Sequence, residues 1–242
     1  MQGTLRTTGA LVAKCLEDTV KNLGLLVICI LPVGFTVLYQ AVLGGAEDAR
    51  HVMSWFVFPT MLTFATTMAP PTIALYTTAL DREKGALRTL LLAGVSLKRL
   101  LLARGIASVL FTAAVTAACF LCAGEPLHRL LPLVALGAAG ATVITLLSLV
   151  PAVFARNQTD SSLYSVPILF VGLAPMFFQY GEALIPFTAY LPTGGMFALA
   201  QLLSQDALFS AEAVLPAVLT VAWIAVAAIV LAVALRHAPR DV

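Results

Sequence analysis

Seven stretches of this chain run for 20 residues or more without a charged side chain, and six of them, all except the one within 182–212, constrain the fold more than any other feature of the sequence. A membrane-spanning helix needs about 20 mostly apolar residues. Within lipid the backbone must satisfy its own hydrogen bonds, which long apolar runs do by forming helices. We therefore expect an all-α membrane protein, a single transmembrane domain over 1–242 with six transmembrane helices at 22–46, 52–80, 105–124, 130–155, 161–181 and 213–235.

The distribution of charge supports this assignment and gives the spans an orientation. Charged residues make up 11% of the chain, against about 25% in soluble proteins. Lysine and arginine accumulate in short cytoplasmic loops. With the N-terminus inside, only Arg50 and Arg129 of the 14 basic residues lie outside. We expect a multi-pass protein of a bacterial-type inner (plasma) membrane with both termini cytoplasmic. A seventh span within 182–212 would leave four basic residues outside and fits less well.

Two further segments carry helical signals of their own. Residues 1–21 place apolar side chains at i, i+3/i+4 spacing with charged residues between them, which predicts an amphipathic helix in the inner interface, next to membrane lipids. A plain extension of the first span is the alternative. Residues 182–212 are apolar but interrupted by Pro186 and Pro192. Because each half is too short to cross the bilayer, we expect two short helices that re-enter the outer leaflet.

Several functional classes lack their usual residues. Ionisable groups in the middle of a span mark proton relays and ion sites, and the central parts of the six runs contain none. The motifs of P-loop nucleotide sites and of zinc proteases are also missing. We therefore expect no catalytic residues, metal or cofactor in this chain, and no nucleic-acid partner. Cys119 and Cys122 form a C-x-x-C pair inside an apolar run, where small buried hydrophobes are more typical than a redox site.

Hydroxyl-bearing residues recur in the second and fifth runs. Thr63 and Thr67 lie in the second, Tyr164 and Ser165 in the fifth. Such side chains bond to the backbone or across helices. They indicate either close helix packing or a path for a substrate. We also expect Asp160 or Ser161 to cap the fifth helix.

One charged interval, DREKGALRTLLLAGVSLKRLLLAR at 81–104, separates the second and third runs. Acidic residues favour a helix N-terminus, and Leu87, Leu90 and Leu91 follow helical spacing. Gly94 suits a helix stop and Ser96 an N-cap. We therefore expect an amphipathic helix at 81–93 on the inner surface. A loop that only sets topology is the alternative.

This interval resembles the cytoplasmic loop of permease subunits of type-2 ATP-binding-cassette exporters. Those loops read acid-base-acid-base-Gly-Thr-Leu-Glu, two leucines, Thr-Pro, a hydrophobe and Ser. Matching positions here run from Asp81 to Gly85, then include Leu87, Leu90, Leu91, Val95 and Ser96. Ala86, Arg88 and the pair Ala93-Gly94 depart from the pattern. Arg88 reverses a charge where the family carries an acid, which bears on partner recognition.

The resemblance implies a function. The loop would be a coupling helix that docks into a dimer of separate ATPase subunits, which hold ATP and Mg²⁺. A second permease chain, identical or paralogous, would complete the exporter, and a small amphipathic, peptide or lipid-like substrate would move outward. The docking residues implied are Asp81, Arg82, Glu83, Lys84, Gly85, Leu87, Arg88, Leu90 and Leu91. Alternatives are a haem-exporter-type permease and, from another class, an ATP-independent scaffold or channel.

Overall fold

The chain is helical throughout the part that the computed structural model describes, residues 2–43, 56–181 and 183–238. This confirms the all-α class for those residues. The elements are α1 (Gln2–Lys21), α2 (Leu23–Leu43), α4 (Phe58–Pro70), η2 (Pro71–Tyr76), α5 (Thr77–Glu83), α6 (Ala86–Leu92), α7 (Leu97–Ala123), η3 (Leu127–Arg129), α8 (Leu130–Ala152), α9 (Gln158–Phe178), α10 (Ile185–Thr188), α11 (Gly194–Ser204), η4 (Ala211–Ala213) and α12 (Val214–Arg236).

Five of the described helical segments are long and apolar enough to cross a membrane, and they identify a multi-pass membrane protein. They correspond to α2, α7, α8, α9 and α12. The second apolar run is built differently, from three consecutive pieces: α4, η2 and α5. The first residues of that run, and the end of the first run beyond residue 43, lie outside the described residues.

Tandem prolines explain the division of the second run. Pro70 ends α4 and Pro71 opens η2, a π-helical turn of six residues. Proline has no N–H and its ring clashes with the carbonyl four residues earlier. Two prolines in sequence therefore interrupt the α-helical ladder, and the wider π geometry carries the helix past them.

The core of the bundle forms where α7 packs against α8, α4, α2 and α1. Small residues allow close approach. A Cβ atom on Gly172 of α9 would lie 2.5 Å from a methyl carbon of Thr67, and one on Gly140 of α8 would lie 2.3 Å from Met196. Helix association in a membrane relies on such close packing, because lipid provides no hydrophobic driving force between helices.

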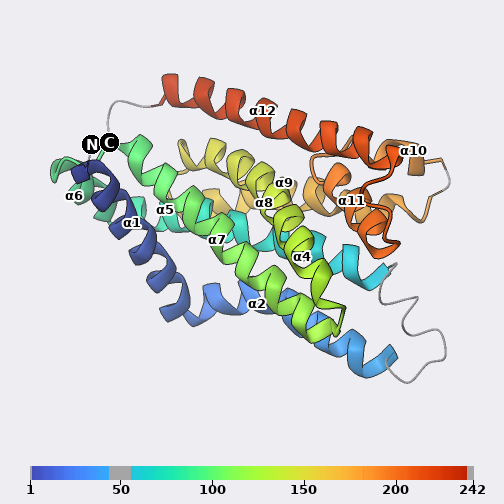
Figure 1. The fold of residues 1–242 in the computed structure, drawn as a ribbon. Coiled ribbons are helices and arrows are strands. Elements are labelled where there is room, and N and C mark those ends of the chain that lie inside the picture. The colour runs from blue at the N-terminus through green and yellow to red at the C-terminus, as the bar shows by residue number, and fades with distance from the viewer. Residues whose placement is uncertain (1, 44–55, 182, 239–242) are drawn as a thin grey trace.

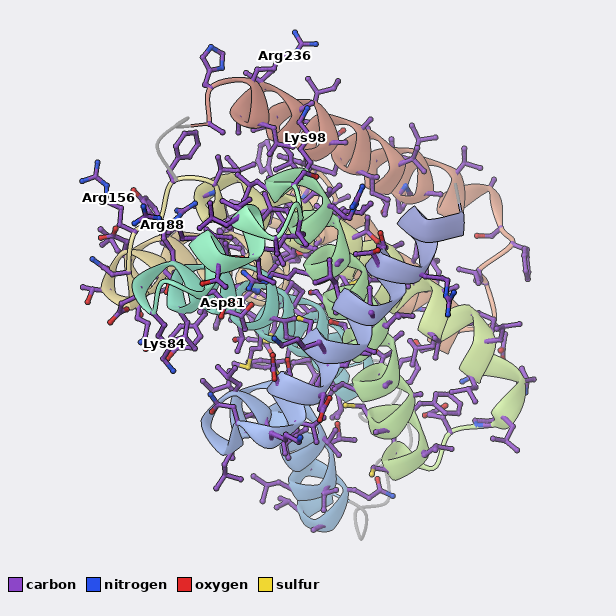
Figure 2. All side chains as sticks on the ribbon, turned by 90° about the vertical axis from the view of Figure 1, so that its left-hand side faces the viewer. Asp81, Lys84, Arg88, Lys98, Arg156 and Arg236 are labelled. Atoms are coloured by element: carbon purple, nitrogen blue, oxygen red, sulfur yellow. The ribbon has the colours of Figure 1, made fainter. Side chains whose placement is uncertain are left out.

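One end of the molecule gathers chain ends and basic residues. The beginning of α1, the end of α12 and the short helix α6 lie together at this end (Figure 1). Figure 2 looks onto it and shows Lys84, Arg88, Lys98, Arg156 and Arg236. We call this the basic end.

At the opposite end, α10 and α11 fill the segment between α9 and α12 (Figure 1). Gly194 begins α11 where a Cβ atom would lie 1.8 Å from the carbonyl oxygen of Thr188. Asp206, just beyond α11, receives two hydrogen bonds from Arg129, at 3.0 and 2.6 Å. Glu125 accepts another from the same guanidinium, at 3.1 Å. This ion-pair cluster joins the α7–α8 turn to the end of α11.

Several helix boundaries differ from the sequence expectation. α7 begins at Leu97, ahead of the span expected at 105–124, and the Ser96 hydroxyl caps it as expected, accepting from Arg99 N at 3.4 Å. α9 begins at Gln158 rather than 161. Its cap is Asn157, whose side chain accepts from Asp160 N at 2.8 Å, and not Asp160 or Ser161 as expected. The Asp160 carboxylate instead accepts from the backbone N–H of Arg156. The Asn157 and Asp160 side chains thus each accept a backbone N–H at the start of α9, much as in a capping box.

Candidate functional site

The charged interval folds into two helices rather than the single helix expected at 81–93. Asp81, Arg82 and Glu83 form the last turn of α5, and α6 begins only at Ala86. Gly85 separates them with φ +73° and ψ 0°. This left-handed conformation suits glycine, which has no Cβ to clash. The expectation failed because the acidic residues extend the preceding helix instead of opening a new one.

The end of α6 follows the sequence expectation closely. Gly94 has φ +85°. Its N–H donates to the carbonyl of Leu91 at 3.0 Å, and Val95 N–H donates to the carbonyl of Leu90 at 3.1 Å. These two bonds define a Schellman stop. α6 is thus bounded by a left-handed glycine before its first residue and another after its last.

Asp81 reaches inward to α7. Its carboxylate forms an ion pair and hydrogen bond with Arg104, whose side chain is only 5% exposed. Arg104 is the last residue of the charged interval at 81–104, and its burial was not predicted from the sequence. Its position was a usable signal for burial, because an apolar run begins at the next residue.

Arg82 and Glu83 bind the ends of two other helices. The Arg82 guanidinium donates to the carbonyl oxygens of Ala155 and of Val153, the latter at 3.1 Å, just beyond α8. Burial, with a contribution from nearby Arg104, lowers the pKa of Arg82, which still leaves an arginine charged. The Glu83 carboxylate accepts from Gln158 N, the first residue of α9, at 3.0 Å. Carbonyls at a helix end attract cations and N–H groups at a helix start attract anions.

The remaining residues of the expected docking set divide by exposure. Leu87 is buried at 1% exposure, so α6 is anchored on the bundle by this side chain. Leu90 and Leu91 are half-buried, whereas Lys84, Gly85 and Arg88 are exposed. Leu92 is 82% exposed although it lies at the basic end. The exposed side chains on and beside α6 therefore include Lys84, Arg88, Thr89 and Leu92, while Asp81, Arg82 and Glu83 bond to other helices.

A cavity of about 850 Å³ lies between α1, the start of α2, and the facing sides of α5, α6 and α7. Asp81 and Arg104 line it, and so do Lys14 and Lys84. A second cavity, of about 10 Å³, lies among apolar side chains of α4, α7 and α8.

The four hydroxyl residues considered for a substrate path do not come together in the structure. Thr63 and Thr67 are fully buried in α4, and the Thr63 hydroxyl donates to the carbonyl of Pro59 at 2.8 Å. Tyr164 is exposed at 42% on α9. The Ser165 hydroxyl donates to the carbonyl of Ser161 at 2.7 Å. None of the four lines either of the two cavities, and a substrate path along them stays a prediction.

The cysteines are all free thiols. Cys119 is buried on α7 and Cys122, one turn later, is exposed. Burial raises the pKa of Cys15, on α1, to about 11, which keeps it a thiol at neutral pH. Among the described residues, no group of three or more His, Cys, Asp or Glu side chains is arranged to hold a metal ion.

Comparisons with known proteins leave the family open: no protein-family model matches the chain, and no curated protein matches it.

Proposed function

We propose that this chain is the membrane-spanning permease subunit of a type-2 ABC exporter, and that α6 is its coupling helix. The observation that carries the proposal is the build of α6. It is a short helix bounded by Gly85 and Gly94, anchored by Leu87, and it presents Arg88 and Leu92 outward at the basic end. Arg88 and Leu92 are the side chains of α6 that an ATPase subunit would contact in this proposal.

The arrangement of the helices supports six spans in this proposal. The start of α1, the loop that carries α6 and the end of α12 lie at one end (Figure 1). A chain that begins and ends on the same side crosses the membrane an even number of times. Five crossings come from the long apolar helices, and the consecutive helical pieces α4, η2 and α5 supply the sixth. The basic residues of Figure 2 favour a cytoplasmic assignment for that side.

The other parts of the exporter follow from the same proposal. ATP and Mg²⁺ belong to a separate ATPase dimer, and a second permease chain completes the transporter. α1 would lie along the inner interface. α10 and α11 would form the outer re-entrant segment. The exposed apolar faces of α2, α9 and α12 would meet lipid or the second permease chain.

Co-purification tests the proposal directly. The chain is expressed with an affinity tag together with a candidate P-loop ATPase, such as one encoded beside its own gene. Retention of the ATPase and ATP hydrolysis in lipid nanodiscs are measured. The double variant Arg88→Ala/Leu92→Asp changes the outward face of α6 without restoring the acid that the family carries at position 88. It should reduce retention of the ATPase at least about tenfold, since interface anchors each contribute on the order of 1–2 kcal/mol or more.

Arg236→Glu is the matched control, because Arg236 is exposed at the same end but lies on α12. It should retain the ATPase. If the double variant retains the ATPase as fully as the wild type, α6 is not the docking helix. If no ATPase is retained by the wild-type chain, an ATP-independent scaffold or channel becomes the better description.

A further inference from the structure

The 850 Å³ cavity beneath α6 has a charge that its own side chains do not neutralise. The charged lining residues are Lys14, Lys21, Lys84 and Arg104 against Asp18 and Asp81. Four cations against two anions leave a net charge of +2. Within the described residues, Lys14 and Lys84 have no ion-pair partner, whereas Lys21 pairs with Glu17 outside the cavity and Arg104 with Asp81.

A buried group at the wall of the cavity adds a second observation. Arg104 is 4% exposed, and its Nη1 has no hydrogen-bond partner within the described part of the chain. Buried polar groups are normally hydrogen-bonded, so such an atom needs an explanation. Asp81 occupies one side of the guanidinium, and an anionic acceptor in the cavity would complete the other side.

Apolar side chains form much of the remaining wall, beside the polar Asn22, Thr77 and Thr89, and they lead toward α2. Leucines from five helices line it: Leu11, Leu23, Leu25, Leu80, Leu90 and Leu100. Leu23 is 73% exposed at the start of α2, and Val27, one turn further, is 49% exposed. An apolar track thus runs from the cavity onto the outer face of a membrane-crossing helix.

We propose that this cavity binds one anionic phospholipid of the inner leaflet. Its phosphate lies among Lys14, Lys84 and Arg104, and an acyl chain follows Leu23 onto α2. A soluble phosphate compound shares the head-group chemistry but makes no use of the apolar track, which is why the geometry favours a lipid. The bound lipid would brace α6 against α1. This inference is independent of the proposed transport function.

Native mass spectrometry of the full-length chain tests the proposal. The protein in mild detergent is mixed with equal amounts of dioleoylphosphatidylglycerol, which is anionic, and dioleoylphosphatidylcholine, which is not. We expect one phosphatidylglycerol retained in preference to phosphatidylcholine. Lys14→Glu/Lys84→Glu should reduce its retention at least about tenfold, because each basic residue near a phosphate changes lipid affinity about fivefold. Lys98→Glu/Arg156→Glu, the control with the same change of charge at the same end (Figure 2), should retain it.

Three results would overturn the proposal. Equal loss in both double variants would mean that lipid follows net charge and not the cavity. Release of phosphatidylglycerol by millimolar glycerol 3-phosphate would assign the site to a soluble phosphate. Undiminished retention in Thr89→Trp would place the lipid elsewhere, since this substitution fills the cavity from the exposed side of α6 and keeps every charge. Thr89→Trp also tests the site if the charge variants fail to fold.

Discussion

Removing Asp81 should destabilise the chain by leaving a buried cation without its counter-ion. Arg104 is 5% exposed at its side chain, and Asp81 is its ion-pair partner. Truncating one partner of a fully buried ion pair costs about 3–5 kcal/mol. Asp81 is itself 33% exposed and borders a cavity that water can enter, so solvent screening lowers the expected loss to about 2 kcal/mol.

The assay is thermal unfolding in a fixed detergent, followed by the monodisperse fraction remaining after heating. For a chain of this size, about 2 kcal/mol corresponds to a fall of roughly 4–8 °C for Asp81→Ala. Asp81→Leu/Arg104→Met removes both charges and should recover most of that loss, because an apolar pair in place of a buried ion pair is often neutral. Glu17→Ala is the control, since it breaks the exposed Glu17–Lys21 pair and should leave the midpoint unchanged.

Two outcomes would refute this reasoning. A midpoint for Asp81→Ala equal to that of the wild type would show that Arg104 does not depend on Asp81 for its burial. A double variant less stable than Asp81→Ala would show that the arginine contributes through other contacts, and that an uncompensated charge is not the source of the loss.

Three further predictions concern other parts of the molecule. Gly194→Ala should lower the unfolding midpoint by several degrees, because its Cβ would overlap the carbonyl oxygen of Thr188 at 1.8 Å, whereas Gly9→Ala in α1 meets no atom within 4 Å and should be neutral or slightly stabilising. Hydrogen bonding from Arg129 lowers the pKa of Asp206 below its ordinary value of 3.8. The ionised Asp206 carboxylate therefore stabilises the fold above pH 3.8, and this stabilisation is lost as pH falls through the lower folded-state pKa. The difference in unfolding midpoint between wild type and Asp206→Asn should shrink to zero in acid. A difference that persists unchanged in acid would contradict the Arg129–Asp206 ion pair as its source. Asn157→Ala should cost about 1 kcal/mol through loss of the α9 cap, measured as a fall in midpoint that Asn157→Asp, which keeps the capping oxygen, does not show.

Helix ends and apolar helices were predicted well wherever a few adjacent residues decide the local structure. The left-handed Gly94 and the Ser96 cap were predictable because a helix stop and a helix start depend on a few adjacent residues. The long apolar helices were predictable for a similar reason, because length and hydropathy decide whether a segment can span a membrane. The π-helical turn at Pro70 and Pro71 was not predicted, although the tandem prolines were a usable signal.

Contacts between distant residues could not be predicted in the same way. The four-residue run Asp81–Lys84 carries alternating charges, and in isolation such a run is typical of an exposed helix start. In the structure its first three side chains bind α7, the end of α8 and the first residue of α9, with partners 23, 73 and 75 residues away. Only the folded bundle brings these groups together, so the sequence assigned the whole run to one exposed surface.

These three contacts have a mechanical consequence for α6. The helix joins α5 through Gly85 and is anchored on the bundle by Leu87. Directly before Gly85, the chain is hydrogen-bonded to α7, to the residues just beyond α8 and to the first residue of α9. A force that passes from α6 to α5 through Gly85 would therefore act on α7, α8 and α9 through Asp81, Arg82 and Glu83. We therefore expect a displacement of α6 that pulls on α5 to move α7, α8 and α9 together.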